Sequence, residues 1–231
     1  MGFGNAKAER PYTKTIKWKS GNDAFEYYDG ENNVAIEIES FTVLEELVSV
    51  SGYSQNAKQG IWSNEVLSLD DDLHVKVGND VVCSGKWKDI KTEVAGKGGK
   101  FTNVVIALLP DGEVVRLLFA GAGCSGWIGK KFNPMSLQCG VTFAGSYEDK
   151  NGSVTFNVPE FGKKPLSAEE TEAAMEAWKS VDAWLKDRGQ QRPDEQDQSH
   201  GYDESIQPEP ANNAFAEAAQ ADNPFSSETP F

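Results

Sequence analysis

The sequence has few of the residues and motifs on which most enzymes depend for catalysis. Its 231 residues include only two histidines, His74 and His200, and no two cysteines have the C-x-x-C spacing of a zinc site. Gly123–Trp127 matches the G-x-S-x-G nucleophile elbow only loosely, because Trp127 takes the last position. No set of nucleophile, base and acid emerges. We therefore expect no catalytic activity, no metal and no cofactor.

Features of membrane and secreted proteins are also missing. No stretch approaches the roughly 18 consecutive apolar residues of a transmembrane helix, and the N-terminus has no apolar signal segment. The three cysteines are widely spaced and odd in number, which favours a reducing compartment. Ala6 stands where a myristoylation signal has Ser or Thr. We expect a soluble cytoplasmic protein without a membrane partner.

Two short segments are similar to ligand-binding loops but do not match them. Gly96–Lys100 lacks the spacing of a phosphate-binding loop, and Phe101 follows Lys100 where that motif has Ser or Thr. We interpret it as a mobile basic loop between strands. Asp70–Asp72 lacks the spaced oxygen ligands of a calcium loop, so it predicts a polar turn before a strand that begins at Leu73.

Acidic residues are in excess, but they are unevenly distributed. The net charge is -14, and residues 189–231 contain nine Asp or Glu against one Arg. Residues 1–166 are nearly neutral, with 18 Lys or Arg against 21 Asp or Glu. Such asymmetry indicates an acidic interaction tail on a body that is itself compatible with anionic partners.

The body has the pattern of a β protein. Val34, Ile36 and Ile38 alternate with polar residues, and turn signals separate further apolar runs. Additional strands are predicted at 13–19, Leu73–Val77, Val81–Lys88, Phe101–Leu109, Val114–Ala120, Leu137–Tyr147 and Val154–Val158. Gly121–Phe132 interrupts this pattern as a long loop or a short helix. Because no βαβ alternation is visible, we expect an antiparallel OB-like β-barrel, with a β-sandwich as the alternative.

The predicted domain organisation has three parts. Residues 1–166 form the OB-like domain, which begins with a basic N-terminal arm. Ser167 and Glu170 form a capping box that opens an amphipathic helix over 167–189, and Gly189 ends it. Residues 190–231 are acidic, interrupted by prolines and poor in large apolar side chains, so we expect a disordered tail.

The tail carries two related tetrapeptides at its end, Asp222–Phe225 and Glu228–Phe231. A terminal carboxylate beside a phenylalanine can be bound jointly by a basic residue and an apolar pocket. An acidic tail that ends in Pro-Phe resembles the tails of bacterial and phage single-stranded DNA-binding proteins. The resemblance implies an OB-fold body and a tip that recruits replication, recombination and repair proteins, through Asp222, Pro224, Phe225, Glu228, Pro230 and Phe231. The alternative is that an endocytic adaptor domain reads Asn223–Phe225.

Basic and aromatic residues recur together in the body, as single-strand binding requires. The candidates for contact with DNA are Lys14, Lys17, Trp18, Lys19, Tyr27, Tyr28, Trp62, Lys86, Trp87, Lys88, Lys91, Lys97, Lys100, Trp127, Lys130, Lys131 and Phe132. The resulting hypothesis is a protein that binds single-stranded DNA with little sequence preference, in the host cytoplasm if a phage encodes it. The alternatives are a β-rich virion or adaptor protein with a solubilising tail, and an enzyme that uses Asp70–Asp72.

Overall fold

The computed structural model describes residues 10–133 and 139–190. Its elements are β1 (Lys14–Lys19), β2 (Ala24–Tyr28), β3 (Asn33–Ile36), β4 (Ser40–Ser54), β5 (Gln59–Ser63), β6 (Leu73–Val77), β7 (Asp80–Gly85), α1 (Trp87–Lys97), β8 (Gly99–Leu108), β9 (Val114–Ala120), α2 (Ala122–Gly129), β10 (Cys139–Asn151), β11 (Val154–Pro165) and α3 (Ala168–Gln190). The prediction of a mainly β fold is confirmed. The tail over 191–231, with its predicted tip, lies outside the described residues, so its disorder stays a prediction.

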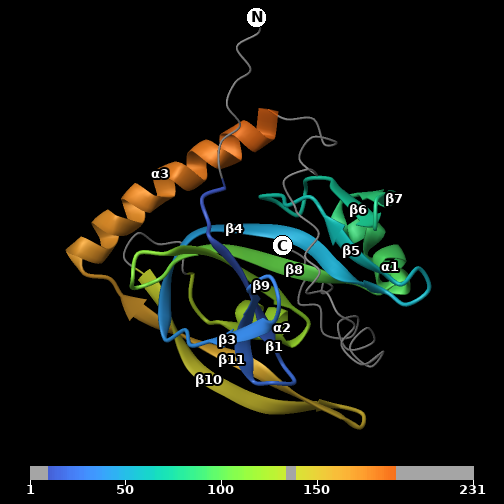
Figure 1. The fold of residues 1–231 in the computed structure, drawn as a ribbon, viewed down its shortest axis with the longest axis horizontal. Coiled ribbons are helices and arrows are strands. Elements are labelled where there is room, and N and C mark those ends of the chain that lie inside the picture. The colour runs from blue at the N-terminus through green and yellow to red at the C-terminus, as the bar shows by residue number, and fades with distance from the viewer. Residues whose placement is uncertain (1–9, 134–138, 191–231) are drawn as a thin grey trace, which may run out of the picture.

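The eleven strands form one connected, open sheet (Figure 1). Its main path runs β3-β2-β1-β9-β8-β4-β5-β6-β7, and β10 pairs with both β11 and the start of β4. The prediction of purely antiparallel pairing is wrong at one place, since β1 and β9 are parallel, with Ile16 opposite Leu117. The segment from β2 to β8 separates these two strands in the sequence, which is long enough for the return that parallel pairing needs.

Strand β4 joins the two halves of the sheet. It runs for 15 residues, and its start pairs with β10 whereas its end pairs with β5. The pairing register with β8 shifts between Val43 and Glu45, which is a β-bulge. A bulge bends a strand and increases its twist. The bend lets one strand contribute Phe41 to one core and Val50 to another.

The segment over 86–100 differs from its prediction. The strand expected to end at Lys88 ends at Gly85, and α1 follows from Trp87 to Lys97. Ile90 and Val94 are buried one turn apart and pack on Val50. Gly98 closes the helix in the left-handed conformation, with φ of 95°. Gly96–Lys100 is therefore the end of a helix and the start of β8, not a mobile loop.

The largest core is rich in aromatic side chains. Most of its buried members come from β1, β2, β4, β8, β9, β10 and α2, and they include Trp18, Phe25, Phe119 and Trp127. The rings of Phe119 and Trp127 are stacked, with centroids 5.0 Å apart. Trp127 is fully buried, and its Nε1 donates a hydrogen bond of 2.8 Å to Glu46 Oε1. The segment expected to be a loop or a short helix is thus α2, which holds a core residue.

Strand β11 approaches the end of β1 across this core. The Asn157 backbone N–H donates to the Ser20 carbonyl at 3.0 Å, and Trp18 Nε1 donates to the Asn157 carbonyl at 3.0 Å. Ser146 of β10 forms a further hydrogen bond with Asp23, which lies between β1 and β2. These side-chain and loop bonds hold the β10–β11 pair near the end of β1 without a continuous ladder.

Helix α3 begins as the sequence predicts. Glu170 N–H donates to Ser167 Oγ at 3.1 Å, and Ser167 N–H donates to Glu170 Oε2 at 2.8 Å, so the capping box is confirmed. Lys164 donates to the same carboxylate, and these bonds lower the pKa of Glu170 to about 2. The helix packs on β4 and β8 through Val181 and Trp184.

The close contact between α2 and β11 allows a test of this packing. We expect Gly126→Ala to destabilise the protein by about 1–3 kcal/mol, because the added Cβ would lie 2.2 Å from the Pro159 carbonyl oxygen. Gly129→Ala is the matched control, since nothing lies within 4 Å of its Cβ. Urea unfolding measures both. Equal midpoints for the two variants would contradict this account of the helix–strand contact.

Candidate nucleic-acid interface

A row of four side chains crosses four neighbouring strands on one face of the sheet. In β8, β4, β5 and β6 respectively, Lys100 pairs with Ser51, Ser51 with Trp62, and Trp62 with Lys76. Directly opposed residues in antiparallel strands point to the same face. At about 4.8 Å per strand, the row spans roughly 14 Å between its two lysines. We refer to Lys100, Ser51, Trp62 and Lys76 as the Trp62 row.

The opposite face of the same strands is apolar. Val50, Ile61 and Val75 alternate with the Trp62 row and are buried against Ile90 and Val94 of α1. Because successive residues of a strand point to opposite faces, burial of this set turns the Trp62 row away from α1. The row therefore lies on the face that α3 covers further along β4 and β8.

Trp62 is half-buried and held in a defined orientation. Its Nε1 donates a hydrogen bond of 3.1 Å to the Gly78 carbonyl, and Lys76 Nζ lies 5.0 Å from the ring centroid. Lys76 covers one face of this ring, so a base can stack only on the other face, and the ammonium group of Lys76 itself suits a phosphate. One aromatic ring and two cations in a row are the groups that binding of single-stranded DNA requires, the ring for a base and the cations for phosphates.

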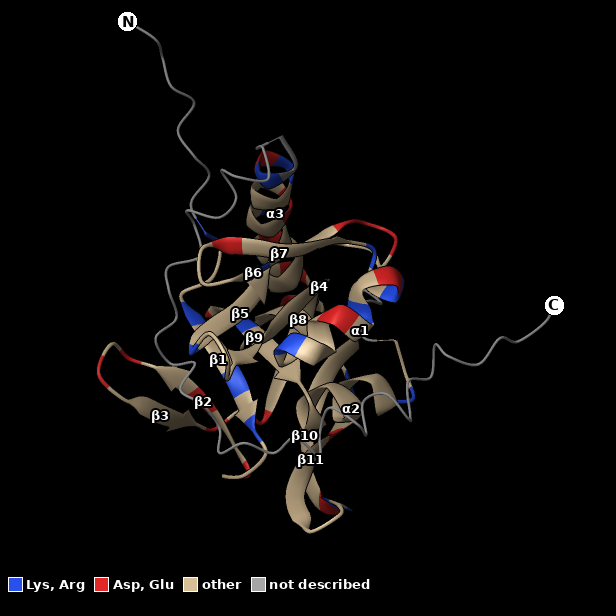
Figure 2. Ribbon diagram, turned by 90° about the vertical axis from the view of Figure 1, so that its right-hand side faces the viewer, with Lys and Arg blue, Asp and Glu red and all other residues tan. Residues whose placement is uncertain are grey.

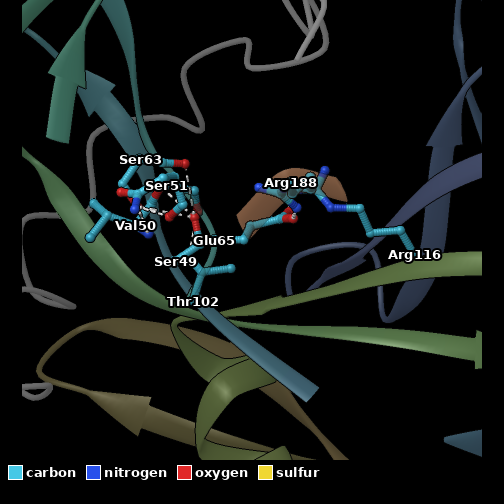
Figure 3. A network of polar contacts seen from close by, with 9 residues as sticks. Ser49, Val50, Ser51, Ser63, Glu65, Thr102, Arg116 and Arg188 are labelled. Atoms are coloured by element: carbon cyan, nitrogen blue, oxygen red, sulfur yellow. Dashed lines mark hydrogen bonds and ion pairs between the residues drawn. The ribbon is translucent and has the colours of Figure 1, made fainter. Parts of the chain in front are cut away.

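Hydroxyl groups of β4, β5 and β8 form hydrogen bonds around Ser51 of this row (Figure 3). Ser51 Oγ and Thr102 Oγ1 are 2.7 Å apart, and Ser49 Oγ and Ser63 Oγ are 3.2 Å apart. The Val50 N–H also donates to Ser63 Oγ at 2.8 Å. Each hydroxyl satisfies another, which makes this part of the sheet polar, whereas the part beneath α3 is apolar.

Two predicted lysines extend the same face at its other end. Lys17 pairs with Leu118, Leu118 with Val104, and Val104 with Leu47, which lies four residues before Ser51 in β4. Ile16 and Trp18 alternate with Lys17 and Lys19, and both are buried in the aromatic core. Lys17 and Lys19 thus point to the side of the Trp62 row.

A buried cluster of charges lies between this face and α3 (Figure 3). Glu65 is shared by Arg116 of β9 and Arg188 of α3; Arg188 Nη1 donates to its Oε2 at 2.7 Å. The side chain of Glu65 is fully buried. The Arg188 guanidinium lies 4.5 Å from the Trp184 ring centroid. The cluster fixes the C-terminal end of α3.

Charges of both signs are distributed over the rest of the described surface. Figure 2 shows Lys or Arg close to Asp or Glu along α1 and α3. Lys97 pairs with Glu93 at 3.6 Å, and Lys86 with Asp70 at 3.9 Å. Pairing with acids reduces the attraction of these lysines for phosphate, so net charge alone does not define an interface.

Four predicted DNA-contacting residues lie in or against the aromatic core. Trp18 and Trp127 are 6% and 0% exposed, which leaves no ring face for a base, and we remove both from the candidate interface. Phe132 packs against the same core. Lys130 lies 3.9 Å from the Trp127 ring centroid, and burial lowers its pKa.

Another predicted group lies away from the Trp62 row. Lys88, Lys91 and Lys97 belong to α1, which packs on the opposite face of the sheet. Trp87 packs on Phe101, with ring centroids 5.2 Å apart. Lys86 directly precedes this helix. These residues and Lys100 are close in the sequence, but the sheet separates them from Lys100.

The remaining candidates lie near the edges. Tyr27 packs against the aromatic core, and Lys14 lies 5.5 Å from its ring centroid. Lys14 also donates to Glu113 at 2.7 Å, and this bond raises the pKa of Lys14. Tyr28 is at the end of β2, and Lys131 is exposed after α2. The structure does not bring them to the Trp62 row.

Sequence reasoning missed Lys76 and Ser51. The alternation of Leu73, Val75 and Val77 with His74 and Lys76 would have placed Lys76 on a polar face. Ser51 had no such signal, because its role depends on which strands pair with β4.

Neither a metal centre nor a membrane span is found in the described ranges. Within 10–133 and 139–190, no group of three or more His, Cys, Asp or Glu could hold a metal ion. Asp71 accepts from the Ser68 N–H at 3.1 Å, so Asp70–Asp72 forms the predicted turn before β6. Among the described helices none is long and apolar enough to cross a membrane. Comparisons with family models, curated proteins and solved structures found no match to this chain.

Proposed function

We propose that this protein binds single-stranded DNA with little sequence preference, during the replication, recombination or repair of bacterial or phage DNA. The observation that carries the proposal is the Trp62 row, in which one aromatic ring lies between two lysines across four strands. Stacking tolerates any base, and ammonium groups bind phosphates irrespective of sequence. The activity is binding rather than catalysis, and it takes place in the cytoplasm.

An OB-like barrel is part of this proposal. Its support is the curved arrangement around the aromatic core, where β11 reaches β1 through the Asn157–Ser20 hydrogen bond. The C-terminal tip is proposed to recruit partner proteins, on the basis of its resemblance to single-stranded DNA-binding tails. Arg188 holds the end of α3, the helix that precedes this tail in the sequence, through its ion pair with Glu65.

Titration with oligo(dT) across salt concentrations tests the proposal. We expect tryptophan quenching on binding, with affinity that falls steeply as salt rises, because counterions are released from phosphates. Lys76→Ala should reduce the slope of log K against log salt by about 0.7, the value for one lost single-strand phosphate contact. Lys150→Ala at the β10–β11 tip is the control and should leave the slope unchanged. Absence of binding at low salt would refute the proposal.

A further inference from the structure

The hydroxyl group of Ser51 lies beside the ring on which a base is proposed to stack. Lys76 of β6 covers one face of the Trp62 ring, with its Nζ 5.0 Å from the ring centroid. Ser51 pairs with Trp62 from the opposite side of β5. Directly opposed residues of antiparallel strands have Cβ atoms about 4.5–5.5 Å apart. A base on the other face of the ring therefore lies above β4, with one edge over Ser51.

Hydrogen bonds decide which group Ser51 offers to this base. Ser51 Oγ and Thr102 Oγ1 are 2.7 Å apart (Figure 3), and Thr102 Oγ1 also donates to the Lys100 carbonyl at 3.3 Å. A hydroxyl carries a single proton and two lone pairs. Because Thr102 gives its proton to the carbonyl, the proton between the two hydroxyls comes from Ser51. Ser51 Oγ therefore offers a lone pair, and it has no proton left for a ligand.

Ser51 is also the accessible member of this hydroxyl group. It is half-buried, whereas Ser49 and Thr102 are 5% and 0% exposed. An oxygen that only accepts hydrogen bonds does not bind a phosphate, because phosphate oxygens are acceptors as well. It suits an N–H group, and in DNA such groups belong to the bases.

Each of the four bases carries an N–H donor on its Watson–Crick edge. Thymine and guanine have a ring N–H there, and adenine, cytosine and guanine have an amino group. In a duplex this edge is occupied by the complementary base. We propose that Ser51 accepts a hydrogen bond from the Watson–Crick edge of the base stacked on Trp62, and thereby selects unpaired bases of any sequence. This inference rests on the proposed binding of single-stranded DNA, and it names the residue that discriminates against a duplex.

A modified oligonucleotide tests the contact directly. Methylation of thymine at N3 removes its only N–H and leaves the face that stacks. We expect the full chain to bind N3-methylated oligo(dT) roughly 2- to 10-fold more weakly than oligo(dT), the range of one hydrogen bond between uncharged groups. Ser51→Ala should lose the same factor on oligo(dT) and no more on the methylated strand, because its smaller side chain accommodates the methyl group. Anisotropy of labelled strands measures all four affinities.

Two serine variants and a duplex serve as controls. Ser51→Thr keeps the hydroxyl and should retain the affinity for oligo(dT). Ser49→Ala removes a buried hydroxyl of the same strand and should leave the affinities for both oligonucleotides unchanged. The salt dependence of Ser51→Ala should equal that of the wild type, because no phosphate contact is lost. Its affinity for a duplex should also equal that of the wild type.

The outcomes separate this inference from the proposed function. If methylation weakens the wild type and Ser51→Ala by the same factor, the inference is overturned, whereas the binding of oligo(dT) and the proposed function stand. Equal affinity of the wild type for methylated and unmethylated strands overturns the inference in the same way. Failure of the wild type to bind oligo(dT) at low salt overturns the proposed function and this inference together.

Discussion

Glu65→Ala is expected to destabilise the protein by about 3–5 kcal/mol. The Glu65 side chain is fully buried, and both Arg116 and Arg188 bond to its carboxylate. Removing one member of a buried ionic cluster leaves buried charges without a partner of opposite sign. The resulting loss of stability is far larger than the loss from breaking an exposed ion pair. Since native proteins are stable by only about 5–15 kcal/mol, the loss should be evident in urea unfolding.

A second acidic residue, Glu172 of α3, provides the control. Glu172 is exposed on α3, and Glu172→Ala should change the free energy of unfolding by less than about 0.5 kcal/mol. In a double-mutant cycle, Glu65→Ala and Arg188→Ala should be strongly non-additive, because both remove the same contact. Additive losses would show that Glu65 does not hold the end of α3.

The sequence predicts elements best where local signals are complete. Val114–Ala120 and Leu73–Val77 coincide with β9 and β6, because alternation and flanking turns agree there. The capping box at Ser167 correctly locates the start of α3. Helix α1 was missed because its start was assigned to the strand predicted over Val81–Lys88 and its end to a loop at Gly96–Lys100, although Trp87, Ile90 and Val94 have helical spacing. Its packing on β7 and β8, with Ile90 and Val94 buried, stabilises it more than its own propensity does.

The candidate site shows a different limit. Trp62, Lys100, Lys17 and Lys19 were among the predicted residues, but only strand register reveals that they share a face. That register depends on β4. The β-bulge between Val43 and Glu45 interrupts the alternation of apolar and polar residues that would have predicted a long strand. Trp18 and Trp127 were misassigned for a related reason. A tryptophan between lysines in the sequence points away from them in a strand, and here it points into the core.

Trp62→Ala is expected to weaken oligo(dT) binding roughly 5- to 150-fold, the equivalent of about 1–3 kcal/mol for one stacked base. Trp62→Phe keeps a flat ring and should retain most of the affinity. Tyr147→Ala removes an exposed ring on β10 and should have no effect. The three affinities are compared at one low salt concentration by anisotropy of a labelled oligonucleotide. Unfolding midpoints of the same variants separate lost contact from lost structure.

This comparison also decides between the two faces of the sheet. Trp87 lies on the α1 side with Lys88 and Lys91, whereas Trp62 lies on the side of Lys76 and Lys100. If Lys88→Ala/Lys91→Ala weakens binding while Trp62→Ala does not, DNA binds across α1 and the Trp62 row is not its site. We expect the reverse, because Lys88 and Lys91 lie on a helix that also carries acids, whereas the Trp62 row aligns a ring and two cations across adjacent strands.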